Sequence, residues 1–157
     1  MKIGALEAGG TKMVCAIGDE YGRIEKRVSF PTQTPKETLP QILEFFGNEE
    51  IAALGIGCFG PVELDRKSPV YGYITSTPKL AWANYDIVGK FAKALGVPVG
   101  FDTDVNGAAL GEVFFGAAKG CDPAIYITIG TGVGVGVYIN GALLHGLIHP
   151  EAGHILI

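Results

Sequence analysis

The sequence predicts an α/β protein with a mixed sheet, followed by the beginning of a second unit of similar design. A glycine-turn hairpin opens the chain, apolar runs typical of buried strands alternate with helical patterns, and a second glycine-turn hairpin begins near residue 123. We therefore expect a first lobe at residues 1–120. Residues 121–157 would be the start of a second, truncated lobe.

The N-terminal segment is typical of three antiparallel strands. Residues 3–7 and 11–17 flank a glycine turn, and residues 23–30 follow a second turn at residues 19–22. Consecutive strands joined by short turns usually pair with one another, so we expect a meander.

Helices and apolar strands alternate in the middle of the chain. Residues 35–46 carry apolar side chains at helical spacing, and residues 51–58 form the continuous apolar run of a buried parallel strand. Residues 59–82 are irregular, residues 84–95 are again helical, and residues 97–101 are expected to be the central strand. An irregular segment as long as 59–82 in a compact domain is usually functional or disordered, and its aromatic residues argue against disorder.

Two carboxylates and an amide, Asp102, Asp104 and Asn106, follow that central strand. A helical pattern then begins, with apolar residues at Leu110, Val113, Phe114 and Ala117. Ligands of open α/β sheets bind outside the carboxyl ends of the strands. This stretch is therefore the candidate catalytic centre.

Asp104 could act as a general base, because a carboxylate held at a helix N-terminus stays ionised and can accept a hydroxyl proton. The structural alternative is that Asp104 only caps the helix. A calcium loop is disfavoured. Such a loop needs an acidic residue at its twelfth position, but that position holds Val113, and Glu112 lies one residue too early.

Two glycine-rich turns carry threonine: Gly9, Gly10, Thr11 and Lys12 in one, and Gly130, Thr131 and Gly132 in the other. Glycine lets backbone N–H groups approach an anion, and threonine adds a hydroxyl donor. One such turn can be a plain hairpin, but two at the starts of similar units favour a phosphate held between lobes. Neither has the spacing of a Walker loop.

A Gly-x-Gly-x-x-Gly pattern at residues 55–60 resembles a dinucleotide fingerprint. That motif must open a helix, whereas Pro61 and a turn-rich segment follow here. Close packing of the backbone, or approach to a ligand, explains these glycines better.

Composition narrows the partners of the protein. The net charge of −4 argues against nucleic acid. The run from Pro123 to Pro150 lacks charged residues, but it is too polar and too rich in glycine to span a membrane. No signal peptide is recognisable, and the three scattered cysteines are expected to be reduced and buried, so we expect a cytoplasmic protein.

Near the C-terminus, Glu151 could accept hydrogen bonds from sugar hydroxyls. His154 could bind a metal or simply pack, and no cysteine follows to complete a site. The chain stops within an apolar strand pattern at Ile157, which suggests a piece of a longer protein.

Taken together, these motifs resemble the ROK family of sugar kinases, which belongs to the actin-like ATPase (ribonuclease H-like) class. The resemblance covers essentially the whole chain, and its motifs are specific only in combination. It rests on Glu7 to Lys12, Gly57-x-Phe59-Gly60-Pro61, Asp104-Val105-Asn106, Ile129 to Gly134, and Glu151-x-Gly153-His154.

The resemblance implies an ATP-dependent transfer of phosphate to a hexose, giving the sugar 6-phosphate, with Asp104 as general base. Both glycine turns would hold the ATP phosphates with Mg²⁺, and His154 would be a ligand of a structural zinc whose other ligands lie beyond the chain. Full-length members are expected to form homodimers. The implied sugar-binding residues are Gly60, Pro61, Thr103, Asp104 and Glu151.

The sequence most resembles bacterial fructokinases within the family. Thr103 and Lys79 stand where many members have asparagine. This favours fructose, with glucose and N-acetylmannosamine as alternatives.

Two other functions stay open. Some relatives are sugar-sensing repressors, but these carry a DNA-binding segment before the first hairpin, which here begins within a few residues of Met1. The chain could also be a non-catalytic sugar-binding module that needs a partner chain.

Overall fold

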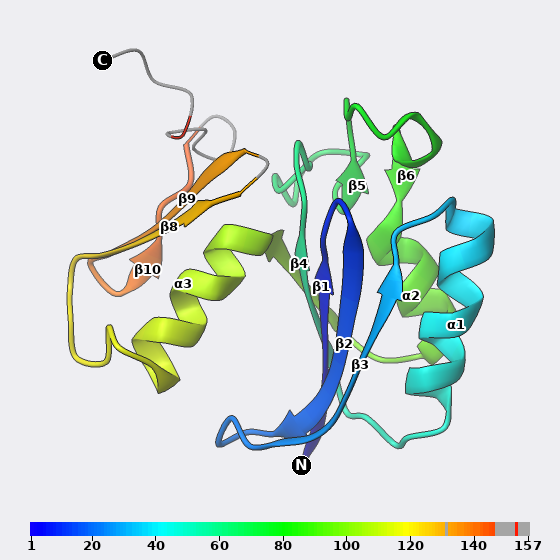
Figure 1. The fold of residues 1–157 in the computed structure, drawn as a ribbon, viewed down its shortest axis with the longest axis horizontal. Helices are drawn as coiled ribbons and strands as arrows, with labels where there is room; N and C mark the ends of the chain where they lie inside the picture. The colour runs from blue at the N-terminus through cyan, green and yellow to red at the C-terminus, as the bar shows by residue number, and fades with distance from the viewer. Residues whose placement is uncertain (131, 147–152, 154–157) are drawn as a thin grey trace.

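The structure, a computed structural model, describes residues 1–130, 132–146 and 153. Its main element is a five-stranded mixed sheet with the strand order β3-β2-β1-β4-β7 (Figure 1). The N-terminal strands form the predicted antiparallel meander, while β4 runs parallel to β1 and β7 parallel to β4. The strands are β1 (Lys2–Ala8), β2 (Lys12–Asp19), β3 (Ile24–Pro31), β4 (Leu54–Cys58) and β7 (Val99–Thr103).

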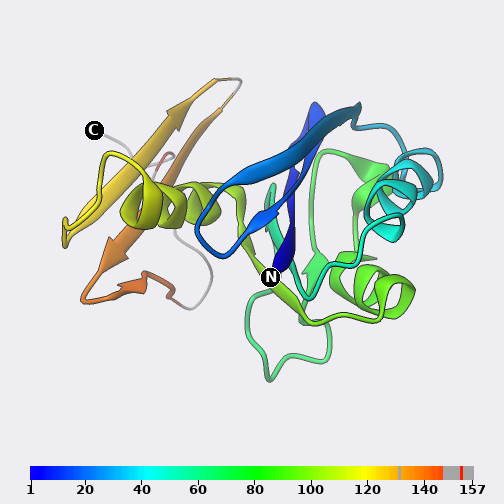
Figure 2. The same ribbon diagram turned by 90° about the horizontal axis from the view of Figure 1, so that it is seen from below.

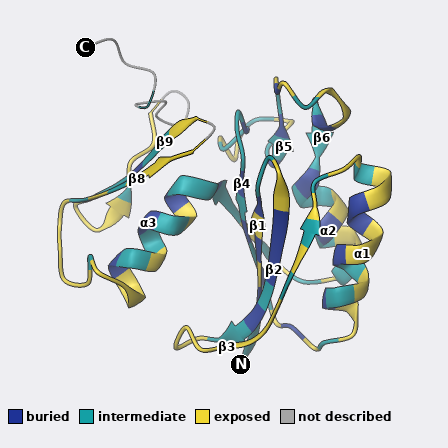
Figure 3. Cartoon of the chain, in the orientation of Figure 1, coloured by how far each residue is buried: buried dark blue, intermediate teal, exposed yellow. Residues whose placement is uncertain are grey.

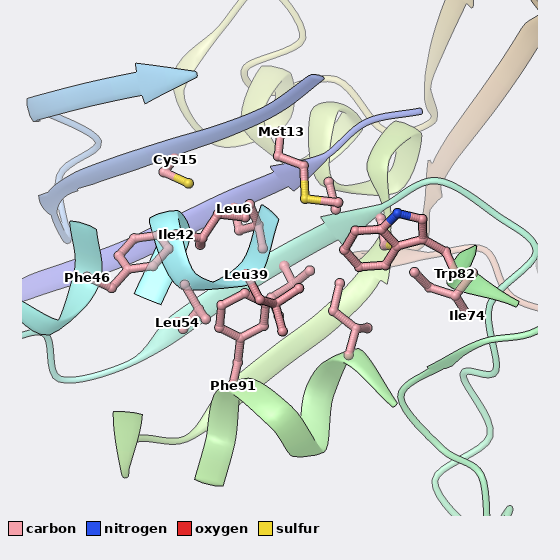
Figure 4. Packing of buried hydrophobic residues seen from close by; sticks show 14 of the residues in the cluster. Leu6, Met13, Cys15, Leu39, Ile42, Phe46, Leu54, Ile74, Trp82 and Phe91 are labelled. Atoms are coloured by element: carbon pink, nitrogen blue, oxygen red, sulfur yellow. The ribbon is translucent and has the colours of Figure 1, made fainter. Parts of the chain in front are cut away.

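One face of this sheet is covered by α1 (Pro35–Gly47) and α2 (Ile87–Leu95). The predicted start of α1 is confirmed: Thr34 and Glu37 form a capping box. Figure 4 shows the core between helices and sheet, where the largest buried side chains include Trp82, Phe46 and Phe91. Burial of this apolar surface is the main stabilising contribution to the lobe.

Three details differ from the sequence prediction. Helix α2 begins at Ile87 rather than Asn84, because the Asp86 carboxylate accepts a hydrogen bond from Gly89 N and caps the helix. The preceding residues instead form β6 (Tyr85–Asp86), which pairs with β5 (Tyr73–Ile74). Strand β7 lies at the edge of the sheet rather than at its centre.

Helix α3 (Asp104–Phe115) lies between the five-stranded sheet and a second, antiparallel sheet (Figures 1 and 2). The second sheet contains β8 (Ala124–Ile129), β9 (Val133–Ile139) and β10 (Ala142–Leu143) in the order β10-β9-β8. A Cβ built on Gly136 would lie 2.3 Å from the carbonyl oxygen of Val105, so glycine lets β9 contact the helix backbone. The repeated strand–turn–strand design is present, but the boundary at residue 120 stays a prediction.

Burial along α3 follows the predicted pattern only in part. Val113 is buried, but Phe114 is exposed and Ala117 lies beyond the helix. On the second sheet, the alternate residues Ile125, Ile127 and Ile129 of β8 are exposed. Figure 3 shows exposed colouring along β8. No described helix has the length and hydropathy needed to cross a bilayer.

Candidate active site

Three predicted site segments leave the main sheet at the carboxyl ends of its parallel strands. The register pairs Ala8 with Cys58 and Cys58 with Thr103, and the three strands run parallel. The next residues along the chain are therefore neighbours: Gly9 and Gly10 after β1, Phe59 to Pro61 after β4, and Asp104 after β7. Adjacent strands are about 4.8 Å apart, so this end of the sheet brings together groups that are distant in sequence.

The Gly9–Lys12 turn presents unused backbone donors. Gly9 N donates to Lys12 O at 3.1 Å, and Thr32 holds the turn from outside through Gly9 O and Thr11 O. In the described part of the chain, the amide groups of Gly10 and Thr11 have no acceptor. A Cβ on Gly9 would lie 2.6 Å from Lys12 O, so the turn needs glycine there. Unused amides in a tight turn suit an anion.

Asp104 is the first residue of α3 and not its cap. The cap is Thr103, whose Oγ1 accepts a hydrogen bond from Asn106 N at 3.2 Å, so the alternative that Asp104 caps the helix is wrong. Asp104 Oδ1 accepts from Val105 N at 2.9 Å. The carboxylate thus lies at the positive end of the helix dipole, which favours its ionised form.

The charge of the Asp104 carboxylate acts on the thiol of its neighbour Cys58. Burial raises the pKa of the Cys58 thiol, and the nearby Asp104 carboxylate raises it further. A Cβ on Gly57 would lie only 3.3 Å from Asp104 Cα, so this glycine allows β4 to approach the start of α3. The position of the carboxylate is therefore set by backbone contacts.

The irregular segment 59–82, which carries the predicted sugar-binding residues Gly60 and Pro61, is well anchored. The Gly60–Pro61 peptide is cis, and Pro61 O accepts hydrogen bonds from both the N and the Oγ1 of Thr75, at 2.9 and 3.1 Å. Trp82 is 1% exposed and donates from Nε1 to Gln33 O at 2.7 Å. The segment predicted to be irregular thus has a fixed conformation, with β5 and a short 3₁₀ helix (Leu80–Trp82) within it.

A cleft of about 670 Å³ lies between the free face of the main sheet, α3 and β8. Its polar lining includes Glu7, Asp102, Asp104 and Thr128. The cleft reaches Asp104, but neither the Gly9–Lys12 turn nor the Gly60–Pro61 segment lines it. The candidate site is therefore defined by the carboxyl ends of β1, β4 and β7 rather than by this cleft.

Sequence reasoning missed a polar cluster beside Asp104. Asp102 Oδ1 accepts from Asn106 Nδ2 at 2.7 Å, and Asp102 Oδ2 lies 2.8 Å from Nε2 of His145. The same His145 nitrogen lies 3.4 Å from Asn106 Nδ2. Asp102 and Asn106, four residues apart across a strand–helix junction, gave a signal, but nothing in the sequence pointed to His145.

Some predicted residues cannot be placed. Thr131, Glu151 and His154 lie outside the described residues. Of the second glycine turn, the described residues Gly130 and Gly132 are joined by a hydrogen bond from Gly130 N to Gly132 O at 2.9 Å. Residues 1–130, 132–146 and 153 contain no group of three histidine, cysteine or acidic side chains that could hold a metal. The zinc site therefore stays a prediction.

The cysteines agree only partly with expectation. Cys15 and Cys58 are buried and free, whereas Cys121 is exposed, so the prediction that all three are buried is wrong. Cys121 follows α3 in an exposed connection, where no strand buries it.

Comparison with known proteins decides the family. The ROK family model matches residues 3–157. The chain belongs to the ROK family. It is 50% identical over 157 residues to a fructokinase of Zymomonas mobilis, covering 96% of this chain and 52% of that protein. It is 49% identical over 154 residues to a fructokinase of Streptococcus mutans, covering 97% and 52%.

Solved structures support the same fold. A ROK family glucokinase from Streptomyces griseus, in complex with glucose and AMPPNP, is similar with a TM-score of 0.82 and 30% identity, covering 96% of this chain and 48% of that one. The fold is thus the actin-like ATPase fold of the ROK sugar kinases, as predicted. The chain spans about half the length of the relatives it matches.

Proposed function

We propose that the protein transfers the γ-phosphoryl group of ATP to a hexose, with fructose favoured, giving the sugar 6-phosphate. The observation that carries the proposal is that the base and the phosphate turn lie at the same carboxyl end of the main sheet. The Asp104 carboxylate and the unused amides of the Gly9–Lys12 turn follow strands whose last residues are in register. These two strands flank β4, so a base and an anion site lie at the same end of one sheet, which is what transfer of phosphate to a hydroxyl needs.

In the proposed reaction, Asp104 accepts the proton of the sugar hydroxyl while that oxygen forms a bond to the γ-phosphorus. The bond between the γ-phosphorus and the oxygen of the leaving ADP breaks, and the electron pair goes to ADP. General-base help of this kind contributes roughly 10²–10⁴ in rate.

The remaining catalysis is positioning and charge neutralisation. The amides of Gly10 and Thr11, with Lys12 and the turn at Gly130 to Gly132, would hold the phosphates. Thr103, Gly60, Pro61 and Glu151 would orient the sugar. Mg²⁺ accompanying ATP would be bound largely through the phosphates, as is usual for this ion, and would neutralise their charge.

The relatives support this assignment. The relatives named fructokinase, which are about 50% identical to this chain in sequence, favour fructose over glucose as the substrate. The similar glucokinase was solved with glucose and AMPPNP, which supports a sugar and a nucleotide as the two substrates here. A structural zinc at His154, a homodimer, a cytoplasmic location and a two-lobe division at residue 120 belong to the same proposal.

The test is Asp104→Asn in the full-length protein, assayed for ADP release with fructose, glucose and N-acetylmannosamine. We expect a loss of turnover of about 10² or more with fructose binding retained. Asp19→Asn is the matched control, because Asp19 lies at the opposite end of the main sheet and asparagine can still accept its hydrogen bonds from Tyr21 N and Arg23 N. Near-normal turnover of Asp104→Asn would contradict the role of the base. Sugar binding by the wild-type protein without ADP release would favour a sugar sensor.

A further inference from the structure

Lys79 reaches the phosphate turn from a different part of the chain. A Cβ built on Gly10 would lie 3.5 Å from Cε of Lys79, the carbon that carries the ammonium group. Lys79 comes from the loop before α2, whereas Gly10 belongs to the β1–β2 hairpin. The turn therefore has a second lysine beside it in addition to its own Lys12.

The backbone of Lys79 is held in place by buried neighbours. Lys79 N donates to Thr77 Oγ1 at 3.3 Å, and Lys79 O accepts from Trp82 N at 2.8 Å. Thr77 is 8% exposed and Trp82 is 1% exposed. Trp82 is in turn fixed to Gln33 O, so the lysine projects from a rigid base towards the turn.

The ammonium group of Lys79 makes no ion pair or hydrogen bond with any residue that the structure describes. Other lysines of the chain do pair, since Lys2 and Lys26 both contact Glu49. Lys79 thus lies beside Gly10, whose amide, like that of the next residue Thr11, has no described acceptor. Three donors without an acceptor around one turn form the complement of an anion with several oxygens.

We propose that Lys79 binds the phosphoryl group that is transferred, as a catalytic residue of the reaction proposed above, on which this inference rests. Its Nζ donates a hydrogen bond to a γ-phosphoryl oxygen of ATP and neutralises charge while the bond to the sugar oxygen forms. The ammonium transfers no proton and forms no covalent bond. This role differs from a sugar contact, because the sugar is neutral and the phosphoryl group is anionic.

The test compares Lys79→Met and Lys79→Arg with Lys119→Met in the full-length protein. Methionine keeps much of the apolar stem and removes the charge, and arginine keeps the charge. Lys119 is exposed beyond the far end of α3, so it controls for loss of a lysine away from the turn. Circular dichroism and thermal unfolding would check that each variant folds.

We expect Lys79→Met to lower kcat by about 10²–10³, the loss typical of one removed donor to developing charge. Its affinities for fructose and for ADP alone should change less than about twofold, while the tight complex with ADP, aluminium fluoride and fructose should be lost. Lys79→Arg should recover part of the rate, and Lys119→Met should resemble the wild type.

Other results would overturn the proposal in distinguishable ways. An unchanged kcat for Lys79→Met would remove Lys79 from the reaction. A weaker fructose affinity with normal kcat would make it a sugar ligand instead. Wild-type protein that releases no ADP with any sugar would refute the proposed kinase and this inference together, whereas active wild type with normal Lys79→Met would refute the inference alone.

Discussion

Nε2 of His145 lies 2.8 Å from Oδ2 of Asp102, and this contact connects the end of β7 with the segment after β10. Asp102 also accepts from the buried Asn106, at the first turn of α3. The segment that follows the second sheet is therefore tied to the strand–helix junction that carries Asp104. A side-chain contact over 43 residues of sequence fixes one part of the site relative to the other.

A double-mutant cycle should detect this contact. We expect Asp102→Asn and His145→Ala in the full-length protein to show a coupling free energy of about 1 kcal/mol, the usual net value of one hydrogen bond. Urea unfolding of the wild type, both single variants and the double variant provides the measurement. Free-energy changes that add within about 0.3 kcal/mol would show that the contact contributes nothing.

Gly57→Ala should displace the candidate base. The new Cβ would lie 3.3 Å from Asp104 Cα and 3.5 Å from Thr103 O, so the start of α3 must shift by a few tenths of an ångström. Because small misplacements of reacting groups are costly, we expect turnover to fall about tenfold to a hundredfold.

The control for Gly57→Ala is Gly47→Ala, at the end of α1, where no atom beyond the helix backbone and the adjacent residues lies within 4 Å of the new Cβ. This variant should keep full turnover. Steady-state kinetics of both variants, with thermal unfolding as a check on folding, makes the comparison. Equal turnover in the two would mean that Asp104 does not depend on contact with Gly57.

Local patterns in the sequence predicted most of the individual elements. The N-terminal hairpin follows from strands around a glycine turn, and α1 from Thr34 before Pro35 at the start of an apolar stripe at helical spacing. The position of Asp104 at the end of a strand was predictable for the same reason. These features depend on neighbours within a few residues.

The errors concern interactions between distant residues. The edge position of β7 depends on pairing with β4, and local hydropathy does not encode it. The helical pattern grouped Phe114 with Val113, but Phe114 is exposed and the buried residues of α3 are Asn106, Ala109 and Val113. Which face of α3 is buried depends on its packing against β9, a contact between distant residues. His145 has no local pattern because its partner lies on another element.

The three cysteines should differ in reactivity. Burial raises the pKa of Cys15 to about 12, and it also raises the pKa of Cys58, so neither forms a thiolate near neutral pH. Cys121 is exposed. We expect iodoacetamide at pH 8.5 to modify Cys121 in the native protein and all three positions in urea, as read by peptide mass spectrometry. Native labelling of Cys15 as fast as Cys121 would contradict its burial.

Cys15 also predicts a loss of stability in base. The pKa of Cys15 in the folded chain is raised above the ordinary thiol value of 9.0, so the folded state keeps its proton to higher pH than the unfolded state. This contribution is complete below pH 9 and is lost as the pH rises from about 9 to about 12. Urea unfolding at increasing pH should show a steeper decline for the wild type than for Cys15→Ala, and equal slopes would refute the assignment.

Glu49 predicts the opposite dependence in acid. Hydrogen bonds from Lys2, whose Nζ lies 2.7 Å from Oε2, and from Lys26 lower the pKa of Glu49 to about 2. The folded-state pKa lies below the ordinary glutamate value of 4.5, so the stabilisation is present above pH 4.5 and is lost as the pH falls towards 2. Glu49→Gln should therefore have a lower Tm than the wild type at pH 6 and a shallower fall of Tm between pH 4.5 and 2. The exposed neighbour Glu50 gives the control Glu50→Gln, which should keep the wild-type profile. If Glu49→Gln retained the full acid dependence, Glu49 would not have a lowered pKa in the folded chain.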